Sequence, residues 1–212
     1  MEKVLVLGAS GRIARWVIEI LAGDKDTELT LYLRHLHKLH GNAPQNAKVI
    51  EGDVLDRKTL DPVVSGQDVV YANLSGDDLA EQIDGIVDAM KKAGVKRLIF
   101  IAALGIYDEV PGKFGAWNRQ KISEHLPRFR KAADLIEASG LNYTIFRPAW
   151  LTNHDEVSYE TTARHESFKG TEVSRKSVAA LVVQAIHDPR RFSHGNLGVN
   201  KPNTDGDKPS WY

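Results

Sequence analysis

The sequence predicts an α/β fold in which a doubly wound, mainly parallel sheet is flanked by helices. Through the first 150 residues, short apolar runs alternate with segments of helical periodicity. This alternation is typical of successive right-handed crossovers between parallel strands. The length of 212 residues suits one domain, because a chain of this size buries a core without disulfides or metals.

Six parallel strands are expected, at residues 3–8, 28–33, 47–51, 68–72, 96–102 and 142–147. A helix follows the fourth strand and ends at Gly94. Its apolar stripe comprises Leu79, Ile83, Ile86, Val87 and Met90. A later helix ends at Gly140, and we expect Pro127 near its first turn, because proline cannot donate the hydrogen bond of a helix interior.

The pattern changes after Pro148. A polar stretch runs to about Gly170, and a helix that Ser174 caps follows and stops at Asp188-Pro189. We expect residues 148–200 to form a cap on the substrate side together with this last helix. Residues 201–212 are polar and contain proline, which predicts a loosely held tail, although Trp211-Tyr212 could dock.

Charge and composition limit the partners. The 28 basic side chains balance the 28 acidic ones, so no global field attracts nucleic acid or an acidic membrane, and a small-molecule substrate is favoured. The chain has no cysteine, which excludes disulfides, thiolate nucleophiles and cysteine metal sites. No cysteine or carboxylate completes a metal site around His35, His37 and His40.

The expected location is the cytoplasm. No apolar stretch approaches the roughly 20 residues that span a bilayer. The first residues lead directly into a strand and do not resemble a signal peptide. Nothing in the sequence indicates an oligomeric state.

The first strand runs through two glycines directly into an amphipathic helix, with the sequence VLVLGASGRIA at residues 4–14. Gly8 permits the tight turn, Gly11 lets the backbone approach phosphates, and Ala14 keeps the helix close to the strand. The free amides and positive end of that helix suit a diphosphate. Residues 1–212 are therefore expected to form a single NAD(P)-binding domain of the Rossmann type.

The second strand ends in Leu33-Arg34 and no acid follows it. An acid at this point binds the free ribose 2′-hydroxyl of NAD, whereas a basic group accommodates the 2′-phosphate of NADP. Arg34, with Arg12, His35 or Lys38, therefore favours NADP(H), with NAD(H) still possible. The alternative is that Arg34 is a solvated surface residue.

Two further strand ends offer polar groups. Asp53 follows the third strand and either accepts a hydrogen bond from the adenine amino group or caps the next helix. Asn73 lies in the small, polar segment 72–76 at the tip of the fourth strand, where a flat ligand could lie. Turn chemistry alone explains this segment equally well.

Four motifs together resemble the atypical short-chain dehydrogenase/reductases: GASGRIA at 8–14, GDV at 52–54, GVKR at 94–97 and SGLNYTIFRP at 139–148. The NmrA-like and flavin reductase (biliverdin reductase B)-like NAD(P)-binding proteins are the nearest groups, and the likeness covers about Lys3 to Ile186. It implies a Rossmann fold with bound NADP(H). The cofactor contacts expected on this basis are Gly8, Ser10, Gly11, Arg12, Ile13, Arg34, Asp53, Val54, Asn73 and Ala102.

The chain departs from this superfamily at the usual catalytic group, a serine with a tyrosine and a lysine four residues apart. The tyrosine and lysine positions hold Leu126 and Arg130, and the serine position is Ala102 or Ala103. An offset segment at 117–121 supplies a lysine but has tryptophan where the phenol should be. The ordinary proton-transfer triad is therefore expected to be missing.

Tyr107 is the candidate for a replacement acid, and a packing or lid role is its alternative. Trp117, Trp150 and His154 follow the fifth and sixth strands and are expected to overhang the nicotinamide end of the cleft. Aromatic walls suit a flat acceptor such as a flavin or quinone, for which orientation and cofactor electronics matter most. Aromatic residues that only pack inside the protein would give the same sequence.

These observations favour an NADP(H)-dependent oxidoreductase that transfers hydride to a small planar acceptor. The alternative is a non-catalytic NADP(H)-binding sensor or regulatory protein. A third hypothesis, a sugar-nucleotide epimerase or dehydratase, requires a larger carboxyl-terminal substrate region and the phenolic acid.

Overall fold

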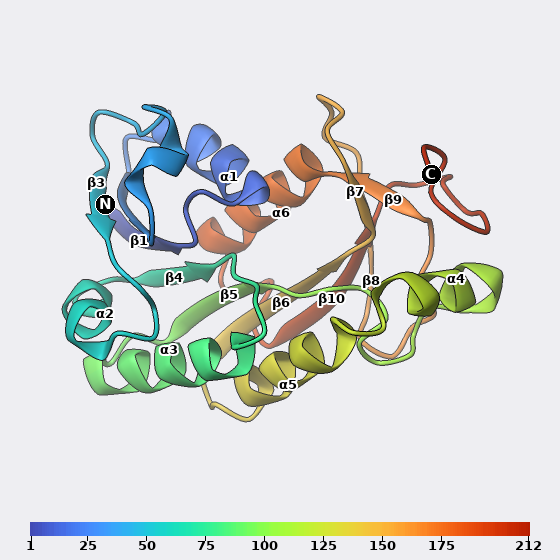
Figure 1. The fold of residues 1–212 in the computed structure, drawn as a ribbon. Helices are drawn as coiled ribbons and strands as arrows, with labels where there is room; N and C mark the ends of the chain where they lie inside the picture. Colours follow the sequence, from blue (N-terminus) through green and yellow to red (C-terminus); the bar gives the residue numbers. More distant parts are fainter.

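The computed structural model describes residues 1–212 and confirms the predicted α/β class (Figure 1). Eight strands form one sheet in the order β3-β2-β1-β4-β5-β6-β10-β8, and all neighbours are parallel except β10 and β8. The strands are β1 (Glu2–Leu7), β2 (Thr27–Leu33), β3 (Lys48–Glu51), β4 (Val69–Ala72), β5 (Arg97–Ile101), β6 (Asn142–Pro148), β8 (Glu160–Thr162) and β10 (Gly195–Asn200).

Helices cover both faces of this sheet (Figure 1). One face packs against α1 (Arg12–Ala22) and α6 (Arg175–His187). The other packs against α2 (Arg57–Val64), α3 (Leu79–Ala93) and α5 (Leu126–Glu137). The remaining helices are α4 (Gly112–Ile122) and the short 3₁₀ helix η1 (Leu36–Leu39). None of these helices combines the length and apolar character that a bilayer crossing requires.

The strands read as continuous apolar runs because both faces of the sheet are buried. In β1, Val4 and Val6 belong to the core under α1 and α6. Leu5 and Leu7 belong to the core under α3 and α5. The alternation of side chains along a strand therefore supplies both cores from one segment.

Three of the predicted helix features are confirmed, whereas α5 ends at Glu137, three residues before the predicted end at Gly140. Helix α3 ends at Gly94, which adopts a positive φ of 73° and donates its amide to the carbonyls of Lys91 and Met90. Helix α5 carries Pro127 in its first turn, where the missing amide hydrogen costs no helical bond. The Ser174 side chain caps α6 by accepting a hydrogen bond from the Ser177 amide at 3.0 Å.

Four strands after Pro148 were not expected from the sequence. Strands β8 and β10 extend the main sheet, while β7 (Trp150–Thr152) and β9 (Glu172–Ser174) pair in parallel as a separate sheet. Three of the four contain three residues each, which is too short for a periodic pattern, and β10 contains two glycines. The polar stretch expected up to Gly170 is thus partly ordered by pairing.

The tail at residues 201–212 is docked, in contrast to the loose tail that its composition predicted. The amide and hydroxyl of Thr171 both donate to the Thr204 carbonyl, at 3.0 and 2.7 Å. The amide and hydroxyl of Ser210 donate to the carboxylate of Glu172, a side chain on β9, at 2.7 to 3.0 Å. The end of the tail also makes aromatic contacts, since the Tyr212 ring lies 4.8 Å from that of Trp117 and the Trp211 ring lies 6.3 Å from that of Trp150.

Candidate functional site

The candidate site lies at the carboxyl ends of β1 and β4. These strands are neighbours, yet the chain builds β2 and β3 on one side before it returns to β4 on the other. A reversal of strand order leaves a crevice at this edge, where ligands bind in open α/β sheets. Two adjoining cavities occupy it, a polar one of about 180 Å³ and an apolar one of about 570 Å³. Both are lined by Gly11, Asn73, Leu74 and Ser75.

The glycine loop between β1 and α1 lies against the end of β4. Gly8 has φ +76°, and a Cβ atom there would stand 2.3 Å from the Asn73 carbonyl oxygen. A Cβ atom on Gly11 would stand 1.9 Å from the Asn73 side-chain nitrogen. Both glycines are thus required by the packing of Asn73 on the loop, in addition to any close approach of a phosphate.

The amino terminus of α1 opens onto the crevice without a protein cap. Gly11 stands at the cap position and has no side chain that could accept a hydrogen bond from the first amides of α1. The first turn of the helix contains no acidic residue. The first amides of a helix have no partner within it, and together with the helix dipole they attract an anion. Ala14 is fully buried, which keeps α1 close to the sheet as the sequence predicted.

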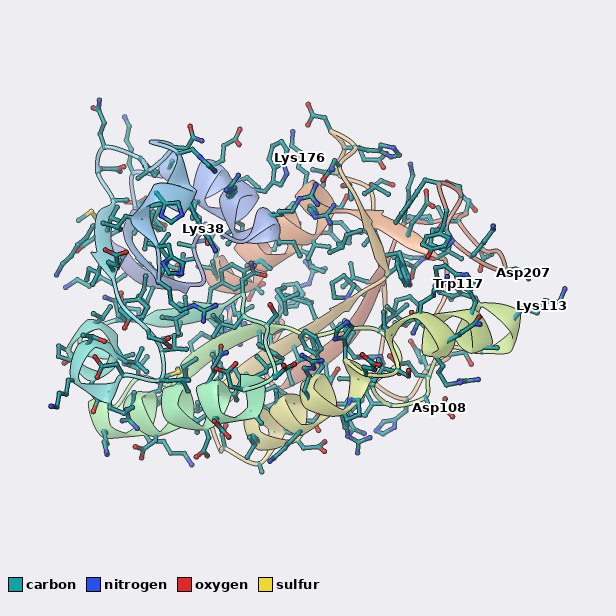
Figure 2. All side chains as sticks on the ribbon, viewed as in Figure 1. Lys38, Asp108, Lys113, Trp117, Lys176 and Asp207 are labelled. Atoms are coloured by element: carbon teal, nitrogen blue, oxygen red, sulfur yellow. The ribbon has the colours of Figure 1, made fainter.

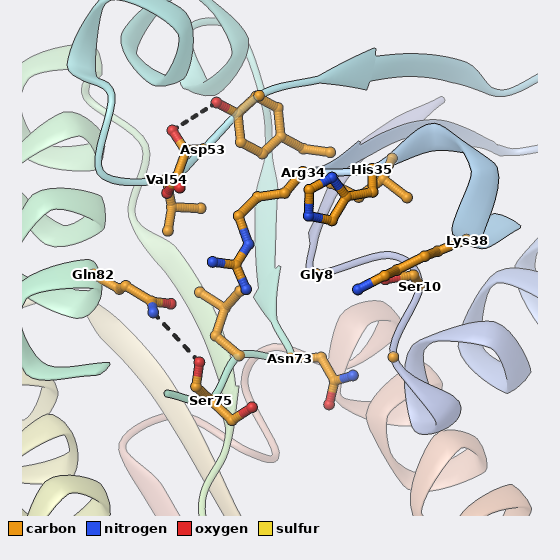
Figure 3. Close-up of a pocket in the computed structure, with 15 residues that line it drawn as sticks. Gly8, Ser10, Arg34, His35, Lys38, Asp53, Val54, Asn73, Ser75 and Gln82 are labelled. Carbon is orange, nitrogen blue, oxygen red and sulfur yellow. Dashed lines mark hydrogen bonds between the residues drawn. The ribbon is translucent and has the colours of Figure 1, made fainter. Parts of the chain in front are cut away.

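The polar cavity is lined by Ser10 and by three basic side chains, Arg34, His35 and Lys38 (Figure 3). Figure 3 shows the Arg34 side chain reaching from the end of β2 into the cavity. Neither Arg34 nor Lys38 forms an ion pair with a carboxylate of the protein. This end of the crevice therefore carries positive charge that a phosphate would neutralise.

Asp53 and Val54 line the same cavity after β3. The helix-cap alternative for Asp53 is wrong, because the side chain of Asp56 caps α2. The Tyr32 hydroxyl donates to the Asp53 carbonyl oxygen at 2.9 Å and holds this turn in place (Figure 3). Burial raises the pKa of Tyr32, so the phenol remains a donor.

The apolar cavity extends from α1 to the loops after β5 and β6. It is lined by Arg12 and Ile13 from α1 and by Ala102, Ala103 and Leu104 after β5. Its other lining residues are Ile101, Ile122, Phe129, Pro148, Ala149, Trp150, Leu151, Arg175 and Trp211, with the four shared with the polar cavity. No tyrosine, lysine, histidine or carboxylate is among these side chains, so the cavity wall offers no ordinary proton donor.

The aromatic residues predicted at this end occupy different layers. Trp150 lines the cavity, and its indole nitrogen donates to the Asn118 side-chain oxygen at 2.9 Å. Trp117, which Figure 2 labels on α4, does not line the cavity. Its ring packs against that of Trp150, with centroids 4.7 Å apart. Trp211 also lines the cavity, which agrees with the docking that the sequence allowed for Trp211-Tyr212. His154 is exposed and lines neither cavity.

Tyr107 is not brought to the crevice. It borders a separate polar cavity, and its hydroxyl accepts a hydrogen bond from the Asn196 side chain at 2.8 Å. The guanidinium groups of Arg130, Arg147 and Arg164 lie 4.7, 5.4 and 4.1 Å from its ring centre. Burial raises the pKa of Tyr107. These contacts fit the packing alternative that the sequence left open for Tyr107.

The loop after β5 is positioned by a buried ion pair that sequence reasoning missed. Arg147 at the end of β6 is fully buried and pairs with Glu109. The Glu109 carboxylate also accepts hydrogen bonds from the amides of Gly105 and Tyr107, at 2.9 and 3.0 Å. Arg147 stands in the SGLNYTIFRP motif, and an arginine within an apolar strand was the signal for such a partner.

Comparison with known proteins extends this geometry. Residues 8–189 match the family model described as NAD(P)H-binding. A Rossmann-fold NAD(P)-binding family protein from Shigella flexneri is 50% identical, with 99% of this chain and 98% of that chain covered and a TM-score of 0.87. A short-chain dehydrogenase/reductase from Veillonella parvula in complex with NADP is 28% identical, with 99% of each chain covered and a TM-score of 0.90.

Among curated relatives, the isoflavone reductase homolog A622 of Nicotiana glauca is 25% identical over 91% of this chain. The chain spans 66% of the length of that relative. The family match covers the glycine loop, the basic end of the crevice and most of the apolar cavity lining. The resemblance noted from the sequence motifs is thereby confirmed: the chain belongs to the NAD(P)H-binding family of Rossmann-fold proteins.

Proposed function

We propose that this protein is an NADP(H)-dependent oxidoreductase that transfers hydride to a small planar acceptor, flavin-like or quinone-like. One observation carries the proposal: a single crevice at the strand-order reversal has a basic, polar end and an apolar, aromatic end. The basic, polar end suits a phosphorylated adenosine. The apolar, aromatic end suits a nicotinamide ring that lies against the flat ring of an acceptor.

The residues present fit a dinucleotide. The α1 amides are uncapped, and Arg34 and Lys38 in the polar cavity form no ion pair with a carboxylate of the protein. The loop at 8–13 would hold the diphosphate, with Ser10, Arg12 and Ile13 beside Gly8 and Gly11. Asp53 and Val54 would hold the adenine, Arg34 with His35 and Lys38 would hold the 2′-phosphate, and Asn73 and Ala102 would hold the nicotinamide half.

Bound NADPH would supply the hydride, and this chain would supply orientation and a dry site. Twelve of the eighteen lining residues are apolar, and they would shield the ring face from water once both ligands are bound. The wall carries no tyrosine, lysine, histidine or carboxylate, which favours acceptors that take hydride first and a proton from water afterwards. Flavins and quinones satisfy this condition because their reduced anions are stabilised by the ring system.

A sensor that binds NADP(H) without turnover is the second candidate, since the same lack of a proton-donating side chain favours it. Epimerase or dehydratase chemistry ranks lower, because no phenol lines the cavity.

The test begins with thermal shifts for NADPH, NADP, NADH and NAD, followed by NADPH oxidation with a panel of flavins and quinones. A ligand that binds only the native state raises the apparent stability. We expect NADPH and NADP, which carry the 2′-phosphate, to raise the melting temperature more than NADH and NAD. We also expect steady oxidation of NADPH with at least one acceptor. Binding without turnover would support the sensor, and equal shifts for all four nucleotides would remove the preference for NADP(H).

A further inference from the structure

Two arginines provide all the formal charge on the wall of the apolar cavity. Arg12 opens α1 and Arg175 opens α6, and both line the cavity together with side chains that carry no charge. Neither forms an ion pair within the protein. Burial and the charge of Arg12 both lower the pKa of Arg175. An anion placed here would relieve this uncompensated charge.

The guanidinium of Arg175 is anchored on one side and free on the other. Its Nη1 donates to the carbonyls of Leu151 and Thr152, each at 3.2 Å, and to the Asn153 side chain at 2.8 Å. Its Nε and Nη2 donate to no protein group. Neither atom is fully buried, so solvent reaches both. Arginine thus presents a fixed, forked pair of donors that matches a carboxylate or phosphate.

The same cavity has an aromatic wall made by Trp150 and Trp211, whose ring centroids are 6.3 Å apart. Trp211 is half exposed, while the preceding Ser210 is tied to the buried carboxylate of Glu172. A side chain that is anchored through its neighbour yet open on its face is available to stack on a ring.

We propose that Arg175 binds an acidic group of the acceptor while Trp150 and Trp211 contact its rings, so that the preferred acceptors are planar aromatic anions. This inference rests on the proposed function, because it places the acceptor at the apolar end. The cofactor diphosphate belongs to the glycine loop and the α1 terminus, with Arg12 beside it. Arg175 begins a different helix and remains available to the second ligand.

Riboflavin and its phosphate, FMN, test this inference, because they share one ring system and differ by one acidic group. Binding of each is measured by calorimetry on protein saturated with NADP, which allows no turnover. We expect FMN to bind the wild type at least about tenfold more tightly than riboflavin, the value of one charge-assisted contact. Arg175→Gln should remove this advantage, and Arg175→Lys, which keeps the charge but loses the fork, should keep part of it.

Lys176→Gln is the matched control, because this neighbouring cation pairs with Asp155 and lies outside the cavity lining. It should leave the FMN advantage unchanged. Trp211→Ala should weaken the binding of riboflavin and of FMN by the same factor, since stacking on the shared ring system does not distinguish them. Thermal unfolding of each variant with NADPH reports the cofactor site independently.

An undiminished FMN advantage in Arg175→Gln would overturn the inference, as would failure of the NADP-saturated wild type to bind FMN. A loss of NADPH affinity in that variant with no change in FMN preference would assign Arg175 to the cofactor instead. The proposed function fails separately if the wild type binds FMN but none of the flavins and quinones in the panel supports oxidation of NADPH.

Discussion

Replacement of Gly8 by alanine should destabilise the protein through two separable effects. Gly8 has φ +76°, and an L-residue in this region costs about 1–2 kcal/mol. The new Cβ atom would also stand 2.3 Å from the Asn73 carbonyl oxygen, well inside the 3.0 Å that such contacts respect. Forced repacking of this kind costs about 1–3 kcal/mol. The expected loss in the free energy of unfolding is therefore about 2–5 kcal/mol.

Gly66→Ala is the matched control, because Gly66 has φ +77° and nothing within 4 Å of its Cβ position. This variant should lose only the part of the free energy of unfolding that comes from the positive φ, about 1–2 kcal/mol. Urea unfolding of both variants, with unchanged slopes, measures the difference. Calorimetry should show weakened NADPH binding for Gly8→Ala alone, since Gly66 lines neither cavity. Equal destabilisation by the two variants would refute the argument that β4 packs on the loop.

Three other substitutions test the site. Arg34→Ala should weaken NADPH binding by about 1.5–3 kcal/mol and NADH binding much less, as measured by calorimetry; equal losses would contradict the assignment of the 2′-phosphate. Glu109→Ala leaves the buried Arg147 guanidinium unpaired and should cost about 3–5 kcal/mol in urea unfolding, and a loss below 1 kcal/mol would show that the pair is unimportant. Tyr107→Phe should leave the pH profile of NADPH oxidation unchanged, because this hydroxyl lies outside the crevice; a shifted profile would restore it as an acid.

Much of the dinucleotide site could be predicted because its residues follow consecutive strands of one topology. Gly8, Arg34, Asp53 and Asn73 stand at the ends of β1 to β4, and parallel strands bring those ends to one edge. Each of them lines the polar cavity. Local sequence suffices to find these residues, because each directly follows a strand and the carboxyl ends of parallel strands lie at one edge of the sheet.

The acceptor end could not be predicted in the same way. Tyr107, His154 and Trp150 all follow the ends of β5 or β6 in the sequence, yet only Trp150 lines the cavity. Loop direction depends on distant partners: Glu109 pairs with a strand that follows it by more than thirty residues, and it holds Tyr107 away from the crevice. Such pairings leave no periodic signal in one sequence.

The sequence by itself determined the α/β class, the glycine loop and the basic group after β2, because strand periodicity, turn chemistry and charge are local properties. Tertiary structure alone decided that Trp211 and Arg175 share a cavity wall. They lie 36 positions apart in sequence and are brought together by the docking of the 201–212 segment on Glu172 and by the anchoring of Arg175 on β7. Hydrogen bonds between distant segments carry this information, and they exist only once the chain has folded.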